Sequence, residues 1–376
     1  MKTRILAVLL CTCVLLGACS GVPNDTQGTE AATLATQEPV KQPDTTEPPV
    51  QSEKEFVKAV YEELPVEDSY YLYGNMQKIN ADDNFVLYGD KVLFPGGKKP
   101  RGLYSYDLNT GKLELYCETP GCSHDTTECR LLRLPRSNLE YYDGKVYSHH
   151  HFSTVKVLED GEWKSLGIYA DEAWHAYGDL FTIAGRNLKV YEDGAGEPRT
   201  ILRDYQYLAN VVFGRYLYSH SCAGLVRVDL LANNPVKEVV METVFCMVEG
   251  DHIYYIDDAE ETSTYYLYRC DMDGKNSELL LDKPVLPASL NFDDEYLYFR
   301  LFTDQKIDGT EEGKDIYRMS KADPSQVEKI ATLDQTAYMT FTVPGRDVLF
   351  VNTYPYGSGV YVMDSDGSNL RKLEMP

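Results

Sequence analysis

Seven copies of one short motif run through this chain between residues 89 and 350. Each copy is a tight polar turn followed by a short run of β-branched and aromatic residues. The apolar landmarks of the seven copies are Val92, Val146, Phe181, Leu217, Ile253, Leu297 and Val348, and the steps between them average about 43 residues. That spacing matches the repeat length of four-stranded propeller blades.

Two further runs follow each landmark. The clearest second runs are Leu267 to Gly274 and Val360 to Gly367, which both end in Asp-x-Asp-Gly, and a third run such as Leu370 to Leu373 closes the unit. Alternating apolar and polar residues between such turns predict antiparallel strands. One unit cannot cover its own apolar face, whereas units arranged radially cover one another. The sequence therefore predicts an all-β fold, a β-propeller of seven four-stranded blades over residues 70–376, with six or eight blades left open.

The N-terminus has the order of regions found in a secretory signal. Lys2 and Arg4 precede an apolar run that ends at Leu16-Gly17-Ala18-Cys19. About twelve apolar residues are too few to span a bilayer. The ending resembles the lipobox of bacterial lipoproteins, in which the cysteine is acylated, for example with palmitate, and becomes the new N-terminus. This resemblance implies a signal peptide over residues 1–18 and lipidation of Cys19.

The segment after Cys19 is polar and rich in Thr and Pro. Of the 33 residues from Ser20 to Ser52, 11 are Thr or Pro. Such a stretch buries too little apolar surface to offset the entropy of ordering it, so we expect a disordered linker over residues 19–55. A short N-terminal segment at residues 56–69 would then lead into the propeller.

The net charge constrains the partners. The formal charge is −23, and removal of residues 1–18 would leave −25 because that segment holds Lys2 and Arg4 but no acidic residue. A surface this acidic repels nucleic acid and anionic headgroups. We therefore expect no nucleic-acid binding and a membrane anchor that relies on the lipid alone. The signal sequence implies a cell-membrane location on the extracytoplasmic face. We also expect a monomer.

The Tyr-x-x-Asp-x-Asp-Gly repeats at residues 268–274 and 361–367 resemble those of TolB-like propellers. They are still more similar to a propeller domain of unknown function in many Gram-positive lipoproteins, which is related to low-density-lipoprotein-receptor propellers. The resemblance covers most of residues 88–376. It implies an extracytoplasmic binding or scaffolding domain without enzymatic activity, whose protein or carbohydrate ligand is not named. The envelope partners of TolB do not carry over, since nothing in this chain matches its separate N-terminal domain.

The longest early step between landmarks contains a cluster of Cys and His, namely Cys117, Cys122, His124 and Cys129. If residues 113–116 form the outermost strand of blade one, the cluster lies on the crossing to blade two. We expect this crossing on the face that also carries the loops between second and third strands. Three thiolates and an imidazole could hold a tetrahedral Zn²⁺. A similar Cys-rich insertion recurs in the lipoprotein propellers, which implies a structural or binding element.

A disulfide is the competing reading of the cluster, because secreted proteins favour disulfides. Once Cys11, Cys13 and the acylated Cys19 are set aside, six cysteines remain: the three of the cluster and Cys222, Cys246 and Cys270. Six cysteines can pair in fifteen ways. In a third reading, Cys222, Cys246 and Cys270 are small buried strand residues. Metal, disulfide and free thiol all stay open at this point.

Two other groups have simpler structural readings. His149, His150 and His151 cannot all share one face of a strand, because successive side chains alternate, so packed or solvated strand histidines are favoured over a metal site. Asp271 and Asp273, like Asp364 and Asp366, resemble the start of a calcium loop. Neither pair is followed by the glutamate that an EF-hand needs, which favours structural turns.

Known catalytic motifs are missing from the sequence. It has no Gly-x-Ser-x-Gly, no His-Glu-x-x-His and no Gly-rich phosphate loop. Roughly 300 residues in seven blades leave no room for an added hydrolase domain. The sequence favours a binding scaffold at the cell envelope. The alternative is a propeller-face hydrolase or lyase for envelope or extracellular glycans, with paired carboxylates across the axial channel.

Overall fold

The computed structural model describes residues 85–375 with gaps. The gaps are residues 97–101, 117–137, 150–152, 161, 177, 206–208, 214, 222–223, 231, 233, 244, 250–251, 259–263, 287–288, 302–313, 344 and 354–358. The predicted signal peptide, Cys19, the linker and the boundary at residue 70 therefore lie outside the described residues. Within the described part, no helix has the length and apolar character needed to cross a membrane.

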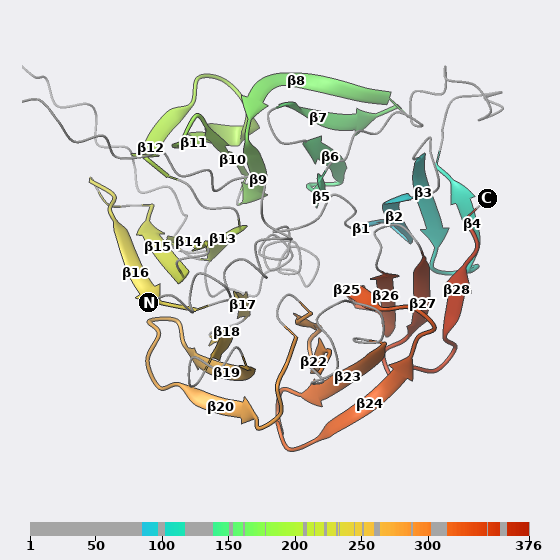
Figure 1. The fold of residues 1–376 in the computed structure, drawn as a ribbon. Coiled ribbons are helices and arrows are strands. Elements are labelled where there is room, and N and C mark those ends of the chain that lie inside the picture. Colours follow the sequence, from blue (N-terminus) through green and yellow to red (C-terminus); the bar gives the residue numbers. More distant parts are fainter. Residues whose placement is uncertain are drawn as a thin grey trace, which may run out of the picture.

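The described chain is all-β and forms seven antiparallel sheets of four strands each, arranged as a ring (Figure 1). Blade 1 holds β1 (Val86–Tyr88), β2 (Lys91–Gly96), β3 (Gly102–Asp107) and β4 (Leu113–Leu115), and blade 2 holds β5 (Asn138–Tyr142), β6 (Lys145–His149), β7 (Ser153–Glu159) and β8 (Glu162–Ala170). Blade 3 holds β9 (Glu172–Ala176), β10 (Asp179–Ala184), β11 (Asn187–Tyr191) and β12 (Arg199–Arg203), with the 3₁₀ turn η4 (Glu192–Gly194) before β12. Blade 4 holds β13 (Ala209–Phe213), β14 (Tyr216–Ser221), β15 (Gly224–Asp229) and β16 (Lys237–Met241).

The last three blades repeat this plan. Blade 5 holds β17 (Phe245–Glu249), β18 (His252–Asp258), β19 (Tyr265–Asp271) and β20 (Glu278–Leu281). Blade 6 holds β21 (Asn291–Phe292), β22 (Tyr296–Phe299), β23 (Asp315–Ser320) and β24 (Val327–Thr332), and blade 7 holds β25 (Ala337–Thr342), β26 (Val348–Thr353), β27 (Val360–Asp364) and β28 (Arg371–Leu373). The prediction of a seven-bladed propeller is confirmed.

Each blade uses four strands that are consecutive in the chain, with the first strand nearest the axis and the fourth at the rim (Figure 1). All seven landmark residues lie on the second strand of a blade. The polar turn before each landmark joins the first strand to the second. The sequence pattern therefore marks the second, third and fourth strands and does not mark the innermost one.

The ring closes by side-chain packing between blades 7 and 1, because no strand is exchanged between them. Phe85, just before β1, packs its ring 5.4 Å from Phe341 and 5.5 Å from Phe350, centroid to centroid. An exposed ion pair joins Arg346 to Asp90 at 2.6 Å, but exposed pairs contribute little. Apolar burial in this aromatic cluster therefore closes the ring.

The two Asp-x-Asp-Gly sequences form structural turns, as predicted. Asp273 Oδ1 accepts the backbone N–H of Lys275 at 3.1 Å, and Asp366 Oδ1 accepts that of Ser368 at 2.8 Å. These carboxylates thus stabilise their own turns.

The glycines that end these turns have a packing role. Gly274 and Gly367 have φ of 79° and 84°, and a Cβ on either would strike the backbone of Val240 or Ile330 in the preceding blade. Only glycine meets both demands at these positions.

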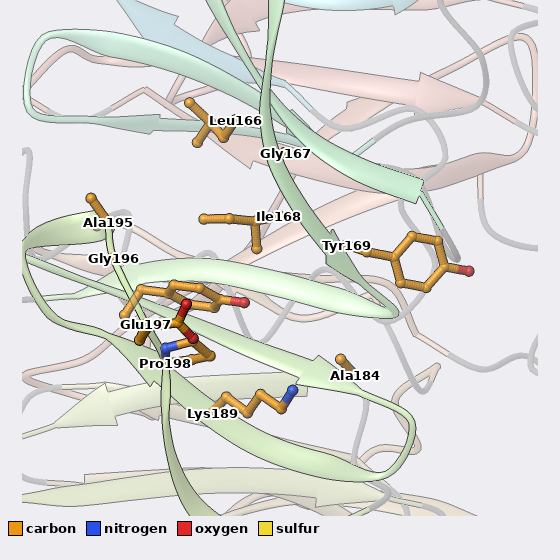
Figure 2. Close-up of a pocket in the computed structure, with 12 residues that line it drawn as sticks. Leu166, Gly167, Ile168, Tyr169, Ala184, Lys189, Ala195, Gly196, Glu197 and Pro198 are labelled. Atoms are coloured by element: carbon orange, nitrogen blue, oxygen red, sulfur yellow. The ribbon is translucent and has the colours of Figure 1, made fainter.

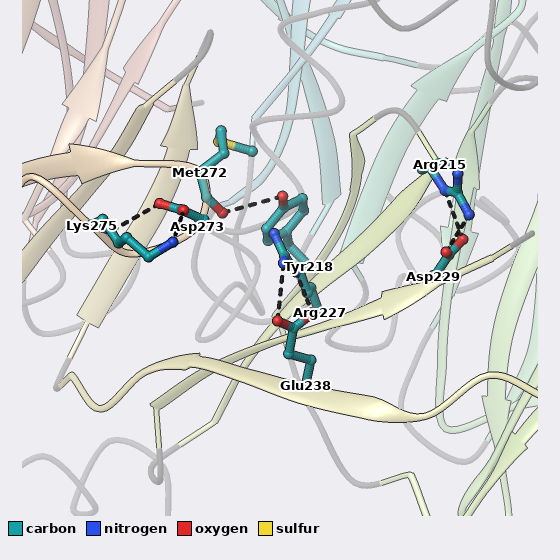
Figure 3. A network of polar contacts seen from close by, with 8 residues as sticks. All are labelled: Arg215, Tyr218, Arg227, Asp229, Glu238, Met272, Asp273 and Lys275. Atoms are coloured by element: carbon teal, nitrogen blue, oxygen red, sulfur yellow. Dashed lines mark hydrogen bonds and ion pairs between the residues drawn. The ribbon is translucent and has the colours of Figure 1, made fainter. Parts of the chain in front are cut away.

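Charged side chains support the strand pairs of the middle blades. Figure 3 shows Arg227 of β15 bound to Glu238 of β16, with a nitrogen–oxygen distance of 2.8 Å, and Tyr218 directed at the Met272 carbonyl of the next blade. The same pairing of a third-strand arginine with a fourth-strand glutamate recurs as Arg269 with Glu278 and as Arg318 with Glu328. Blades 4, 5 and 6 thus share this arginine–glutamate pair in addition to the repeated apolar residues.

Candidate functional site

The predicted Cys/His site, made of Cys117, Cys122, His124 and Cys129, lies outside the described residues. Its flanking strands are described: β4 is the outermost strand of blade 1 and β5 the first strand of blade 2. The expectation that residues 113–115 form the outermost strand of blade 1 holds, while the place of the cluster, zinc and a disulfide remain predictions. Among the residues that the structure does describe, no group of three or more His, Cys, Asp or Glu side chains could hold a metal.

Two of the remaining cysteines are described, and both are buried free thiols. Cys246 lies on β17 and Cys270 on β19, inside the apolar cluster that joins blades 3 to 5. This bears out the reading of these two as small strand residues, whereas Cys222 lies outside the described part. Burial raises the pKa of the Cys270 thiol to about 12. The other four cysteines have three ways to pair among themselves.

The interface between blades 2 and 3 contains a small apolar cluster. Its apolar cluster has only four buried members, Val155, Ala170, Ala173 and Leu180. Two of them are alanines, and cores need side-chain volume to fill the space between sheets. Tyr147, Ile168 and Tyr191 pack against this cluster and are partly buried.

A groove of about 640 Å³ opens beside this cluster (Figure 2). One wall is the end of β8, residues 166–169, and the other is formed by β10, β11 and the turn at residues 194–198. Small residues, Gly167 on one side and Ala184 on the other, leave the space between the walls. We call this feature the blade 2–3 groove.

Polar groups lie around the blade 2–3 groove. Lys189 of β11 and Glu197 of the following turn both line it, as Figure 2 shows. Tyr191 lines it as well, and burial together with the Glu197 charge raises the pKa of its hydroxyl. The groove therefore offers an ammonium donor, a carboxylate acceptor and a phenol that stays protonated.

Closer to the axis, the same interface holds a buried glutamate–histidine pair. Glu140 of β5 accepts the backbone N–H of His175 at 2.8 Å, and its second oxygen lies 2.9 Å from His175 Nδ1. Tyr142 and Tyr147 cover the imidazole, with ring centroids at 5.0 and 4.1 Å. Both oxygens of this carboxylate thus bind within the interface, so its role is to hold two blades together.

Of the three consecutive histidines, only His149 is described. It is buried, and its Nε2 lies 3.2 Å from Glu172 Oε2 at the start of blade 3. The reading of a packed strand histidine is confirmed for His149, while His150 and His151 lie outside the described residues.

His149 occupies a position that recurs around the ring, four residues after the start of the second strand. The equivalent residues, counted from the register with the third strand, are polar and buried in blades 4, 6 and 7: His220, Arg300 and Asn352. His220 and Arg300 both reach toward the next blade, since His220 lies against Phe245 and Arg300 donates to the Ala337 carbonyl. The sequence analysis missed this recurring polar position, although it lies at a fixed number of residues after the start of each second strand.

Comparison with known proteins adds no family. Neither a scan of protein-family models nor a search of the curated proteins finds a match. Among solved structures, the chain is similar to the extracellular domain of a putative one-component system of B. thetaiotaomicron, with a TM-score of 0.49 and 13% identity over 74% of this chain and 38% of that chain.

Two further structures show similar values. PorZ, a bacterial surface component of the type-IX secretion system of Porphyromonas gingivalis, has a TM-score of 0.48 at 12% identity over 78% of this chain and 38% of that one. A putative TolB from Agrobacterium tumefaciens has 0.38 at 13% identity over 52% and 76%. Likenesses this weak assign neither a family nor a function, and the specific resemblance to lipoprotein propellers stays a prediction.

Proposed function

We propose that this protein is a membrane-tethered extracytoplasmic lipoprotein whose β-propeller acts as a binding scaffold at the cell envelope. The observation that carries the binding role is the blade 2–3 groove, an open space of about 640 Å³ with polar groups on its walls. Ligand sites in proteins fall in this range of volume and combine apolar walls with a few polar groups. The lipobox-like ending at Cys19 supports the tether.

Two carboxylates in the blade 2–3 interface are held in structural contacts. A glycosidase needs two carboxyl groups that face the scissile bond from opposite sides. Glu140 and Glu172, by contrast, are each bound to a histidine inside the blade 2–3 interface. Neither is placed to serve as an acid or a base for a substrate in the groove.

Fatty-acid labelling tests the tether. Cells producing the full chain are grown with an alkyne fatty acid, and the protein is then isolated and its N-terminal peptide analysed by mass spectrometry. We expect acylation at Cys19, loss of label in Cys19→Ser, and retained label in the matched control Cys11→Ser. An unlabelled wild-type chain, or label kept in Cys19→Ser, would refute the tether.

Retention of envelope material tests the binding role. The full chain in mild detergent is immobilised and exposed to polysaccharide and protein fractions of the envelope. We expect material to be retained without any increase in reducing ends. Release of new reducing ends would instead establish a glycan hydrolase or lyase.

A further inference from the structure

We infer that the blade 2–3 groove is a saccharide site that accepts neutral or amino sugars. This inference rests on the proposed binding function and gives it a ligand class and a place.

The shape of the groove suits a ring-shaped ligand between two flat walls. The walls carry side chains of β8, β10 and β11, together with the backbone of Gly167 and of the turn that holds Gly194 and Gly196. Ile168 projects from β8 toward the space, with Pro198 on the opposite side (Figure 2). These apolar atoms can pack against the C–H faces of a sugar ring.

The polar groups match the hydroxyl edges of such a ring. Lys189 donates hydrogen bonds, Glu197 accepts them, and the Tyr191 hydroxyl can do both. A sugar hydroxyl is likewise both donor and acceptor, so each of these groups can find a partner on it.

A buried hydroxyl lies in the same interface as the groove, beneath its lining residues. Thr182 is fully buried, and its Oγ1 has no hydrogen-bond partner among the described residues. It shares a face of blade 3 with two lining residues, because it pairs with Lys189 across β10 and β11 and lies two residues before Ala184. Buried polar groups in proteins are normally satisfied. The Thr182 oxygen has almost no surface that a ligand in the groove could touch, and a water held inside the interface would satisfy it.

Charge selects among saccharides. The chain carries a formal charge of −23, and Glu197 adds an exposed carboxylate at the groove itself. Long-range repulsion therefore disfavours uronic acids and other anionic polysaccharides. An amino sugar can pair with Glu197, and a neutral sugar is not repelled by these charges.

Titration of the full chain in detergent with defined oligosaccharides tests the inference. The probes are the tetramers of N-acetylglucosamine and glucosamine, with a tetragalacturonate as the anionic comparison. We expect heat of binding with at least one of the first two and none with the third. Glu197→Gln and Lys189→Met should each weaken binding by at least about fivefold, since each loses one charge-assisted hydrogen bond.

Matched controls separate the groove from the rest of the surface. Glu162→Gln, on the far end of β8, and Lys283→Met, between blades 5 and 6, are exposed changes outside the groove and should alter the affinity less than about twofold. Ala184→Trp fills the groove and should abolish binding. Melting curves of all variants report whether the fold is kept, and the two surface substitutions stay informative if Ala184→Trp does not fold.

The outcomes distinguish this inference from the proposed function. If no saccharide binds, or if the groove variants bind as the wild type does, the saccharide site is refuted. The scaffold role survives in that case, provided that the wild type still retains envelope material. If the wild type retains no envelope material either, the proposed function fails as well.

Discussion

His220 makes the stability of the propeller depend on pH. It lies on β14, is 5% exposed, and its Nε2 has no partner among the described residues. Burial away from water lowers the pKa of this imidazole from 6.5 to about 4, and a hydrogen bond to the Thr243 backbone opposes only part of that effect. The folded protein therefore holds His220 neutral at pH values where the unfolded chain protonates it.

The size of the effect follows from the two pKa values. With about 4 in the folded state and 6.5 in the unfolded state, the stabilisation is complete above pH 6.5 and is lost as the pH falls toward 4. Between pH 7 and pH 5 the free energy of unfolding should drop by about 2 kcal/mol because of this residue alone.

Urea unfolding at several pH values, followed by fluorescence, measures this drop. In His220→Asn the part due to His220 should vanish, so the variant should lose about 2 kcal/mol less than the wild type between pH 7 and pH 5. Asparagine is a suitable replacement because Asn352 occupies the equivalent position of blade 7. His220→Leu cannot titrate either and should show the same reduced slope, whatever its absolute stability. Equal slopes in wild type and both variants would show that His220 is not a buried neutral group.

Two other predictions address the described cysteines and the turn glycines. Cys246 and Cys270 should resist iodoacetamide in the folded protein and react only on unfolding, because burial raises both thiol pKa values; peptide mass spectrometry reads this out, and native labelling of either would contradict it. Gly367→Ala should cost about 2 kcal/mol or more, since it adds a clash with Ile330 to a positive φ, whereas Gly345→Ala has open space and should cost about 1 kcal/mol. Equal losses in urea unfolding would rule out the clash.

The repeat could be predicted from sequence because its signal is local. A polar turn and the strand after it lie within about ten residues, so each blade can be recognised from its own local sequence. The innermost strands lack such a signal. The extreme case is Asn291–Phe292, a two-residue strand whose place is fixed by pairing with Tyr298 and Leu297. Pairing partners of this kind become visible only in the fold.

The groove could not be predicted for a different reason. It exists because Gly167 and Ala184, small residues on different blades, leave the space between two walls. Neither local sequence shows that the residue facing it from the other blade is also small. The buried pair of Glu140 and His175 is hidden in the same way, since its members are 35 residues apart.

A closed ring helps to explain how a groove can open at one interface. Each blade is held by two neighbours, so a groove between blades 2 and 3 need not separate them while the other contacts hold. The contact that closes the ring is rich in large aromatics such as Phe85 and Phe350. The blade 2–3 contact instead combines a thin apolar cluster with the bond between Glu140 and His175. That bond fixes the two blades near the axis, where their first strands meet, and leaves the rim free to remain open. Local stability differs across a protein, and binding regions tend to come from its less stable parts. An interface that is held together near the axis and open at the rim provides such a region without destabilising the ring.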